Sequence, residues 1–250
     1  MARRKPEDIV ALVEAHYDAT EPLRQRMQDD HALYRLEPFD AGEGYQSYTS
    51  NDPRTYAEKV IHWVSSAEMT VRIPHDGAES KIRERNDMKE RFLIGLLKAA
   101  DERLCRLMLP TLRDQIGWYA VIRGWYAGRA LLAKRPDGST YVDITPWDPL
   151  HTYWGTGSDG LEWICYKVPK TKEQILSQYN IKMDWEAQYT ADGINVYDFY
   201  DKEFNTILIH NGSTTQPLTR VVKKQTRHGA DRVPAFLGPI GSNPYIVALS

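Results

Sequence analysis

The sequence predicts an α+β fold, with N-terminal helices followed by an antiparallel β-rich region that contains one inserted helix. Apolar residues recur at intervals of three and four through the first half, which is the spacing of one helix face. The second half has short apolar runs bounded by Gly, Pro, Asn and Asp, which is typical of strands and turns. Because helices precede strands and do not alternate with them, the order favours α+β over a βαβ layout.

Five helices are expected in the first half, over residues 6–17, 21–34, 53–67, 79–109 and 112–123. Pro6 and Pro53 suit first-turn positions, and Thr20 and Asn51 or Asp52 are expected caps. One face of the third helix is expected to be apolar, formed by Tyr56, Val60, Trp63, Val64 and Ala67. A short strand is expected over residues 70–73, ending at Pro74.

The expected helix over residues 79–109 has two different halves. Its first half is densely charged from Lys81 to Arg91, and mixed signs at these spacings predict a solvated face with local ion pairs. Its second half carries an apolar stripe, formed by Phe92, Leu93, Leu96, Leu97, Ala100, Leu104 and Leu107.

The stretch from Leu112 to Trp154 organises the chain around it. A helix is expected to end near Gly124 and Gly128, where glycine suits a left-handed cap or close backbone approach. Two strands, over residues 129–134 and 141–145, are expected to form a hairpin, because a Pro/Asp/Gly turn separates their apolar runs.

Five further strands are expected over residues 161–168, 194–200, 206–210, 218–224 and 233–237. Thr171 is expected to cap the inserted helix, and Asn211-Gly212 predicts a hairpin turn. Residues 155–160 are expected to form a glycine-rich loop. The expected organisation is therefore a helical part over residues 1–125, a β-rich part over residues 126–240, and the start of a further element over residues 241–250, where we expect the chain to be truncated.

Composition limits the function classes. The chain has 250 residues and a formal net charge of −2, so bulk attraction to nucleic acid is not expected. Cys105 and Cys165 lie far apart without metal-ligand spacing, and they are expected to be reduced, buried thiols. No signal peptide and no run of about 20 apolar residues is recognised. The 15 Tyr and 7 Trp suit either a β-rich core or half-exposed interfaces.

No motif for bond chemistry is found, so we expect no catalytic, cofactor-binding or metal-binding residue and no enzyme activity. The seven histidines form no HxH or HExxH pattern, and no serine lies in GxSxG. The glycine-rich residues 155–160 lack the lysine of a phosphate loop. An enzyme of small hydrolase type remains the alternative if Asp143, Asp148 and His151 meet in a pocket.

A basic cluster near the C-terminus is the strongest electrostatic feature of the sequence. It contains Arg220, Lys223, Lys224, Arg227 and Arg232, together with His228. These cations suit contact with phosphates, contact with acidic residues of a neighbouring subunit, or the exposed face of a hairpin.

Four features in order resemble the N-terminal wing portion of tailed-bacteriophage portal proteins, the head-tail connectors. The first feature is a helix that is led by Ser50-Asn51-Asp52-Pro53 and ends in a short strand at Ile73. The second is a long charged helix followed by a helix-Gly-strand unit from Ile116 to Lys134. The third is the strand pair that leads into Ile144-Thr145-Pro146-Trp147-Asp148-Pro149, and the fourth is the return segment from His228 to Ala235. The resemblance covers about residues 45 to 240, and its order carries more weight than any single motif.

The resemblance implies a wing-like α+β fold and a structural role in a homo-oligomeric ring, typically of twelve subunits, at one vertex of the phage head. Double-stranded DNA would pass through the ring during packaging and ejection. The implied partners are the major capsid protein, the scaffold, the terminase large subunit and the tail adaptor, with no cofactor and no membrane. The implied location is the portal vertex of the virion, and the host cytoplasm during assembly. The family's stem and clip are not recognised in this sequence. Another virion head or adaptor protein is the alternative.

Overall fold

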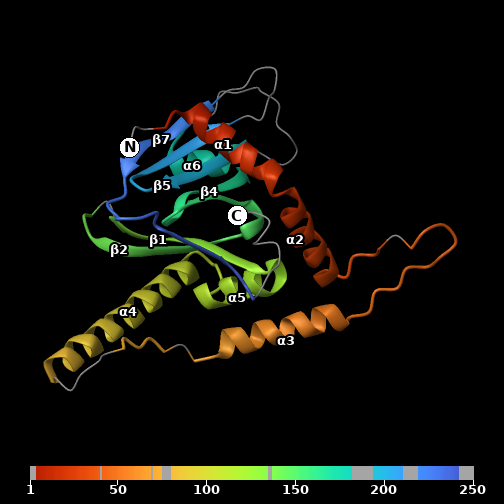
Figure 1. Ribbon diagram of the computed structural model, residues 1–250, viewed down its shortest axis with the longest axis horizontal. Helices are drawn as coiled ribbons and strands as arrows, with labels where there is room; N and C mark the ends of the chain where they lie inside the picture. The colour runs from red at the N-terminus through yellow and green to blue at the C-terminus, as the bar shows by residue number, and fades with distance from the viewer. Residues whose placement is uncertain are drawn as a thin grey trace. The chain divides into compact units, whose positions relative to one another are not determined.

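The computed structural model describes residues 4–39, 41–68, 70–74, 80–134, 137–181, 194–210 and 219–241, without the side chains of Ser80, Lys223 and Lys224. The helices are α1 (Pro6–Ala19), α2 (Glu21–Tyr34), α3 (Asp52–Ser66), α4 (Ser80–Arg106), α5 (Leu112–Arg123), the short 3-10 helix η1 (Pro149–His151) and α6 (Lys172–Tyr179) (Figure 1). The strands are β1 (Trp125–Lys134), β2 (Thr140–Trp147), β3 (Thr152–Gly157), β4 (Gly160–Lys170), β5 (Ile194–Asp201), β6 (Phe204–His210), β7 (Thr219–Arg227) and β8 (Ala235–Pro239). The predicted α+β class, with one helix inserted in the β-rich region, is confirmed.

The chain divides into two compact units. The first consists of residues 1–28 and 147–237, and the second of residues 29–146 and 238–250. Each unit combines helices from the N-terminal half with strands from the C-terminal half. The compact units therefore have other boundaries than the expected segments 1–125 and 126–240. The expected element over residues 241–250 lies outside the described residues, apart from Gly241.

The first unit is a five-stranded antiparallel sheet in the order β3-β4-β5-β6-β7. Helix α1 crosses one face of the sheet, and Ile9, Val10 and Val13 pack there against aromatic and aliphatic strand residues (Figure 1). Helix α6 covers the other face through Ile175. Burying each large apolar side chain of this kind contributes roughly 1.5–3 kcal/mol, so the sheet is held from both sides.

Alternation along the central strands explains why both faces are apolar. On β5, Val196 lies in the core beneath α6, whereas Tyr197 and Phe199 lie in the core beneath α1. On β6, Leu208 points to the α1 side and Ile209 to the α6 side. Successive side chains of a strand point to opposite faces, so two covered faces require a nearly continuous apolar strand.

Residues 155–157 belong to strand β3 and Gly160 begins strand β4, so the expected glycine-rich loop over residues 155–160 is reduced to a turn at residues 158–159. Gly155 lies opposite Trp163 of β4, and a Cβ at position 155 would come within 2.0 Å of the Trp163 indole nitrogen. Glycine is therefore required by a bulky neighbour across the sheet, which is a close-approach role and not a turn.

The second unit contains α3, α4, α5, strand β1 and nearly all of β2, and the three-stranded sheet has the order β2-β1-β8. Gly124 ends α5 in the left-handed conformation, with φ of 68°, and confirms the predicted left-handed cap. Strand β1 begins directly afterwards at Trp125, so Gly128 lies inside the strand and does not interrupt the chain, contrary to the prediction.

Several predicted local features are corrected. Residues 70–74 form no strand, because the backbone N–H of Ile73 donates to Oε1 of Glu90 on α4 over 2.6 Å. Thr20 does not cap α2, since its hydroxyl donates to the carbonyl oxygen of His16 at the end of α1. Asn51 makes no side-chain capping bond to α3. Thr171, in contrast, caps α6 as predicted, and the structure adds the side chain of Gln174, which completes a capping box.

Candidate functional site

The outward face of α3 carries large apolar side chains that the second unit leaves in solvent. Tyr56 is 70% exposed and Trp63 is 66% exposed. The buried residue of α3 is Ala57, on the side that packs against α5. Val64 approaches α5 closely, since a Cβ at Gly117 would lie 3.2 Å from its Cγ1. The predicted apolar face is thus divided, because Tyr56 and Trp63 point away from the helix that α3 packs against.

Bonds from α5 hold α3 in this position. The guanidinium of Arg113 donates to the carbonyl oxygens of Ser65 (3.0 Å) and Ala67 at the end of α3. Thr111 caps α5 by accepting from the N–H of Asp114. The inner side of α3 is therefore fixed against α5, and its outward face remains exposed to solvent.

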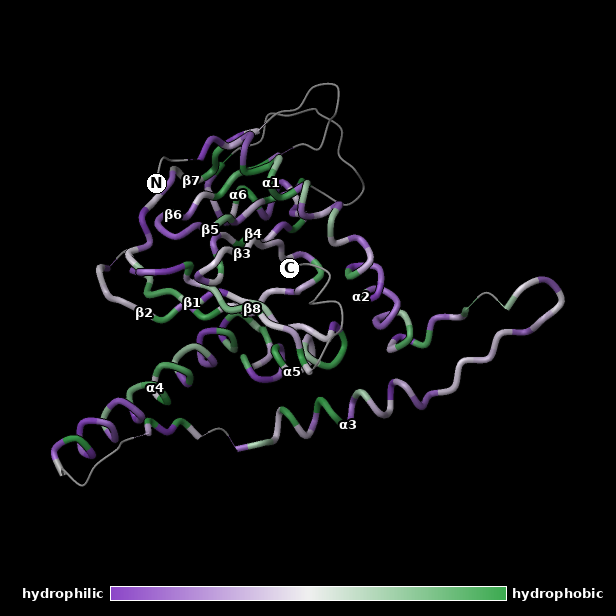
Figure 2. The backbone as a smooth tube through the Cα atoms, viewed as in Figure 1, coloured by the Kyte–Doolittle hydropathy of each residue, from purple (hydrophilic) through white to green (hydrophobic). Residues whose placement is uncertain are grey.

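Helix α4 is 27 residues long, but Ala100 and Leu104 are its fully buried apolar residues, and both lie in its last third. Its N-terminal half runs away from the β1/β2 hairpin (Figure 1). Met88 is 71% exposed and Phe92 is 64% exposed. Figure 2 shows hydrophobic residues recurring along both α3 and α4. The predicted apolar stripe is therefore packed only near the C-terminal end of α4.

The C-terminal part of α4 is anchored by Asp143 of β2, which is 5% exposed. Arg103 of α4 lies 2.9 Å from Oδ1 of Asp143, and Arg129 of β1 lies 2.9 Å from Oδ2. The hydroxyl of Thr145 also donates to Oδ1 over 2.8 Å. A buried carboxylate needs such partners, since an unpaired buried charge is costly. The site is a structural junction between α4 and the hairpin.

The residues of the enzyme alternative have separate structural roles. Asp143 belongs to the second unit, whereas Asp148 and His151 belong to the first. Oδ1 of Asp148 accepts from the N–H of Leu150 and so caps η1. The backbone N–H of His151 donates to the carbonyl oxygen of Asp148. Among the described residues, no group of three or more His, Cys, Asp or Glu side chains is arranged to hold a metal ion.

The first half of α4 carries cations that make no ion pair within the described part of the chain. Lys81, Arg85 and Lys89 follow at intervals of four, so their Cα atoms lie along one side of the helix. All three are exposed, which confirms the predicted solvated face. The predicted local ion pairs between the mixed charges from Lys81 to Arg91 do not form in the described part of the chain. Like charges at this spacing destabilise a helix slightly, so the stripe does not serve the stability of α4 itself.

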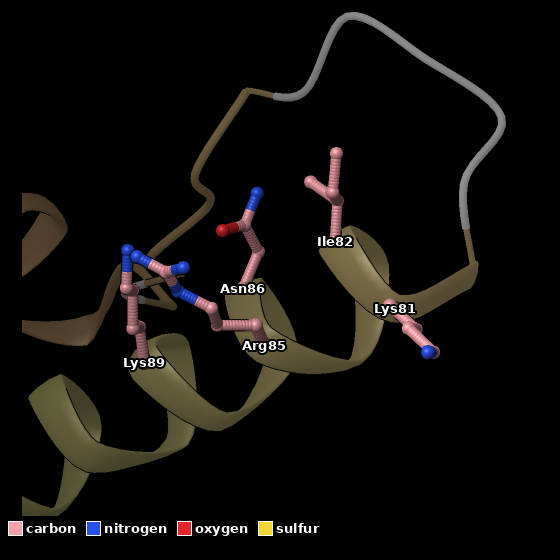
Figure 3. Close-up of a pocket in the computed structure, with 5 residues that line it drawn as sticks. All are labelled: Lys81, Ile82, Arg85, Asn86 and Lys89. Carbon is pink, nitrogen blue, oxygen red and sulfur yellow. The ribbon is translucent and has the colours of Figure 1, made fainter.

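A shallow surface depression of about 400 Å³ lies beside this stripe, lined by Lys81, Ile82, Arg85, Asn86 and Lys89. Figure 3 shows Ile82 and Asn86 pointing to one side of α4, while Lys81 points away from them. In the same view Arg85 and Lys89 extend to the side of the picture opposite Lys81. The lining is cationic and open, which suits a surface contact more than an enclosed ligand.

The predicted basic cluster lies on β7, the edge strand of the first unit, and on the segment after it. Arg220, Arg227 and Arg232 are exposed, and Arg227 lies 3.8 Å from Glu203. The side chains of Lys223 and Lys224 lie outside the described residues. Charged side chains on an edge strand deter pairing with other strands, which accounts for a cluster at this position.

One polar junction in the first unit was not predicted. Oε1 of Glu14 on α1 accepts from Nζ of Lys167 (2.8 Å) and from the hydroxyl of Tyr197 (2.6 Å). Burial raises the pKa of Glu14, but the two hydrogen bonds outweigh it and the net pKa lies below the ordinary value. The partners are 153 and 183 residues away along the chain, so no sequence spacing signals this contact.

His16 lies next to this junction, with ring centroids 4.6 Å from Trp154 and 5.9 Å from Trp163. Burial, with a smaller contribution from Arg24, lowers the pKa of His16 to about 4. The imidazole is therefore neutral at pH 7 and packs as an aromatic side chain. Cys165 is buried as predicted, and burial raises its thiol pKa, whereas Cys105 is exposed, contrary to the prediction.

No helix among the described residues is long and apolar enough to cross a membrane. Comparison with known proteins finds no family that matches this sequence and no curated protein similar to it.

Proposed function

We propose that this chain is the wing portion of a phage portal subunit, a structural protein that assembles with copies of itself into a ring. The observation that carries the proposal is the pair of outward helix faces in the second unit, with Tyr56 and Trp63 on α3 and Met88 and Phe92 on α4. The order of motifs from the helix at Asn51-Asp52-Pro53 to the return segment at His228–Ala235 supports the same family.

The two units differ in how far their large apolar side chains are exposed to solvent. The first unit buries most of them beneath α1 and α6. The second leaves four large side chains on two helices more than 60% exposed. Clustered exposed apolar side chains mark interaction surfaces, and Trp and Tyr contribute strongly to binding. A subunit that is completed only by its neighbours has this distribution.

A ring follows when the two contacting faces differ. A heterologous contact places one face of a subunit against a different face of the next, and it closes into a ring if the rotation permits. Within the proposal, the assembled ring is the DNA conduit at the portal vertex and the attachment point for the terminase large subunit and the tail adaptor. It would also contact the major capsid protein and the scaffold. The role is structural, with no bond chemistry.

The test is the mass and shape of the purified chain in solution. Mass photometry over a concentration series, with negative-stain images of the largest species, is expected to reveal rings with a central opening. A double substitution, Tyr56→Ser with Trp63→Ser, is expected to lower the assembled fraction while leaving the melting temperature nearly unchanged, since both side chains are exposed. Leu176→Ser with Val221→Ser, at exposed positions of the first unit, is the matched control.

A monomer at every concentration and salt would contradict the proposal for this chain. A closed dimer or another small assembly would favour the alternative, a different head or adaptor protein. Rings that persist in the Tyr56→Ser, Trp63→Ser variant would mean that the α3 face makes no contact between subunits.

A further inference from the structure

Helix α4 presents cations and large apolar side chains together on its outward side. Helix geometry places Lys81, Arg85, Lys89, Met88 and Phe92 within about 100° of one another around the axis. All five are exposed, and none of the three cations makes an ion pair within the described residues. The stripe from Lys81 to Phe92 is about 16 Å long at 1.5 Å per residue.

Helix α1 presents the opposite pattern. Between Pro6 and Ala19 it contains no Lys or Arg, and Glu7, Asp8 and Asp18 are exposed. None of these three carboxylates has an ion pair among the described residues. Ala11 and Ala15 lie between them on the same outward side, and both are exposed. The acidic stripe from Glu7 to Asp18 is also about 16 Å long.

We propose that the outward face of α4 docks onto the outward face of α1 of a second copy of this chain. The three cations, which span about 12 Å along α4, would meet an acidic stripe of about 16 Å that has Glu7 and Asp8 at one end and Asp18 at the other. The side chains of Met88 and Phe92 would lie over the flat surface at Ala11 and Ala15, where small residues permit close helix approach. The inference rests on the proposed self-assembly and names the two surfaces that make it.

Charge favours this pairing over contact between identical faces. Two α4 faces would bring six cations together, and two α1 faces would bring six carboxylates together. Like charges opposed across an interface are strongly unfavourable, so each face selects the other. The contact is heterologous, which is the type that closes into a ring.

The experiment is a charge exchange on the full chain, followed by mass photometry and sedimentation velocity. The α4 variant carries Lys81→Glu, Arg85→Glu and Lys89→Glu, and the α1 variant carries Glu7→Lys, Asp8→Lys and Asp18→Lys. Each is expected to raise the concentration needed for half assembly at least about tenfold, and the combined variant is expected to restore most of it. Assembly of the unchanged chain is expected to weaken as salt rises from 0.05 to 0.5 M, because exposed charges are screened.

The matched control is Arg83→Glu, Arg91→Glu and Lys98→Glu, which changes the charge of α4 equally on its other side. Circular dichroism establishes that each variant is folded. If the α1 variant does not fold, Asp18→Lys alone replaces it, measured with and without the three substitutions of the α4 variant.

The outcomes separate the two proposals. A monomeric unchanged chain overturns self-assembly itself. Normal assembly in which the α4 variant behaves like its control, or in which the combined variant shows no recovery, overturns the α4–α1 contact alone. Loss of binding to a labelled DNA duplex by the α4 variant, with assembly unchanged, would assign the face to nucleic acid and also overturn it.

Discussion

The hydroxyl of Tyr197 donates a hydrogen bond to Oε1 of Glu14 over 2.6 Å, and this bond ties α1 to the middle strand of the first unit. Lys167 donates to the same oxygen, so one carboxylate serves two strands. The bond to Glu14 and burial both raise the pKa of Tyr197, burial most, which keeps the phenol protonated as the donor. Helix α1 is therefore held on the sheet by the hydrogen bonds of Glu14 as well as by its buried apolar side chains.

Glu14→Gln is expected to lower the free energy of unfolding by about 1–2 kcal/mol, because Lys167, whose side chain is 15% exposed, loses its ionised partner. Urea unfolding at pH 7 measures the change. Glu21→Gln, at an exposed acidic residue in the first turn of α2, is the control and should change the value by less than about 0.5 kcal/mol. Equal losses in the two variants would mean that the junction contributes nothing.

The free energy of unfolding is expected to decrease as the pH is lowered, because of His16. Its pKa is about 4 in the folded chain against an ordinary value of 6.5, so the unfolded chain binds the proton first as the pH falls. The contribution of His16 to the free energy of unfolding should therefore decrease by up to about 3 kcal/mol as the pH falls from 7 to 4, and it should level off below pH 4.

His16→Phe is expected to flatten that part of the pH profile, since the aromatic contacts with Trp154 and Trp163 remain while the titrating group is removed. Thermal melts at pH 7, 5.5 and 4.5 measure the difference between the two proteins. A parallel decline of both proteins would assign the acid sensitivity to other groups. Glu14 adds its own loss at lower pH, because its pKa is lowered in the folded chain.

Asp143→Asn is expected to be the most destabilising of these changes, by about 3 kcal/mol, because it leaves Arg103 and Arg129 without their anion. Thr145→Val removes one hydrogen bond to the same carboxylate and should cost about 1 kcal/mol. Chemical denaturation followed by circular dichroism compares the two. If Asp143→Asn is no worse than Thr145→Val, the charged junction does not anchor α4.

Gly155→Ala is expected to lose about 1–3 kcal/mol, because its Cβ would overlap the buried ring of Trp163. Gly95→Ala is the matched comparison, since nothing lies within 4 Å of a Cβ at that position in α4. It should gain about 0.5–1 kcal/mol, because alanine is favoured over glycine in a helix. Changes of the same sign at both positions would contradict the close-approach role of Gly155.

Local features were predicted well where the deciding residues lie within a few positions of one another. The predicted cap at Thr171 and the predicted left-handed end of α5 at Gly124 depend on short-range hydrogen bonds and on the φ angle that glycine permits. The order of helices and strands, and hence the α+β class, follows from apolar periodicity in the same way.

Features that depend on a distant partner were not predicted. Periodicity placed Tyr56, Trp63 and Val64 on one apolar face, but only the position of α5 decided that Val64 is in contact and Tyr56 and Trp63 are in solvent. The requirement for glycine at 155 comes from Trp163 across the sheet, and the role of Asp143 comes from Arg103 on another element.

The sequence predicted the α+β class, most of the helices and strands, the cap at Thr171 and the left-handed end of α5 at Gly124, because each depends on neighbouring residues. Tertiary structure alone decided which apolar faces are covered, which carboxylates are paired and which glycines touch a neighbour. Burial and ion pairing are relations between residues far apart in the chain, and no periodicity within one segment specifies its partner.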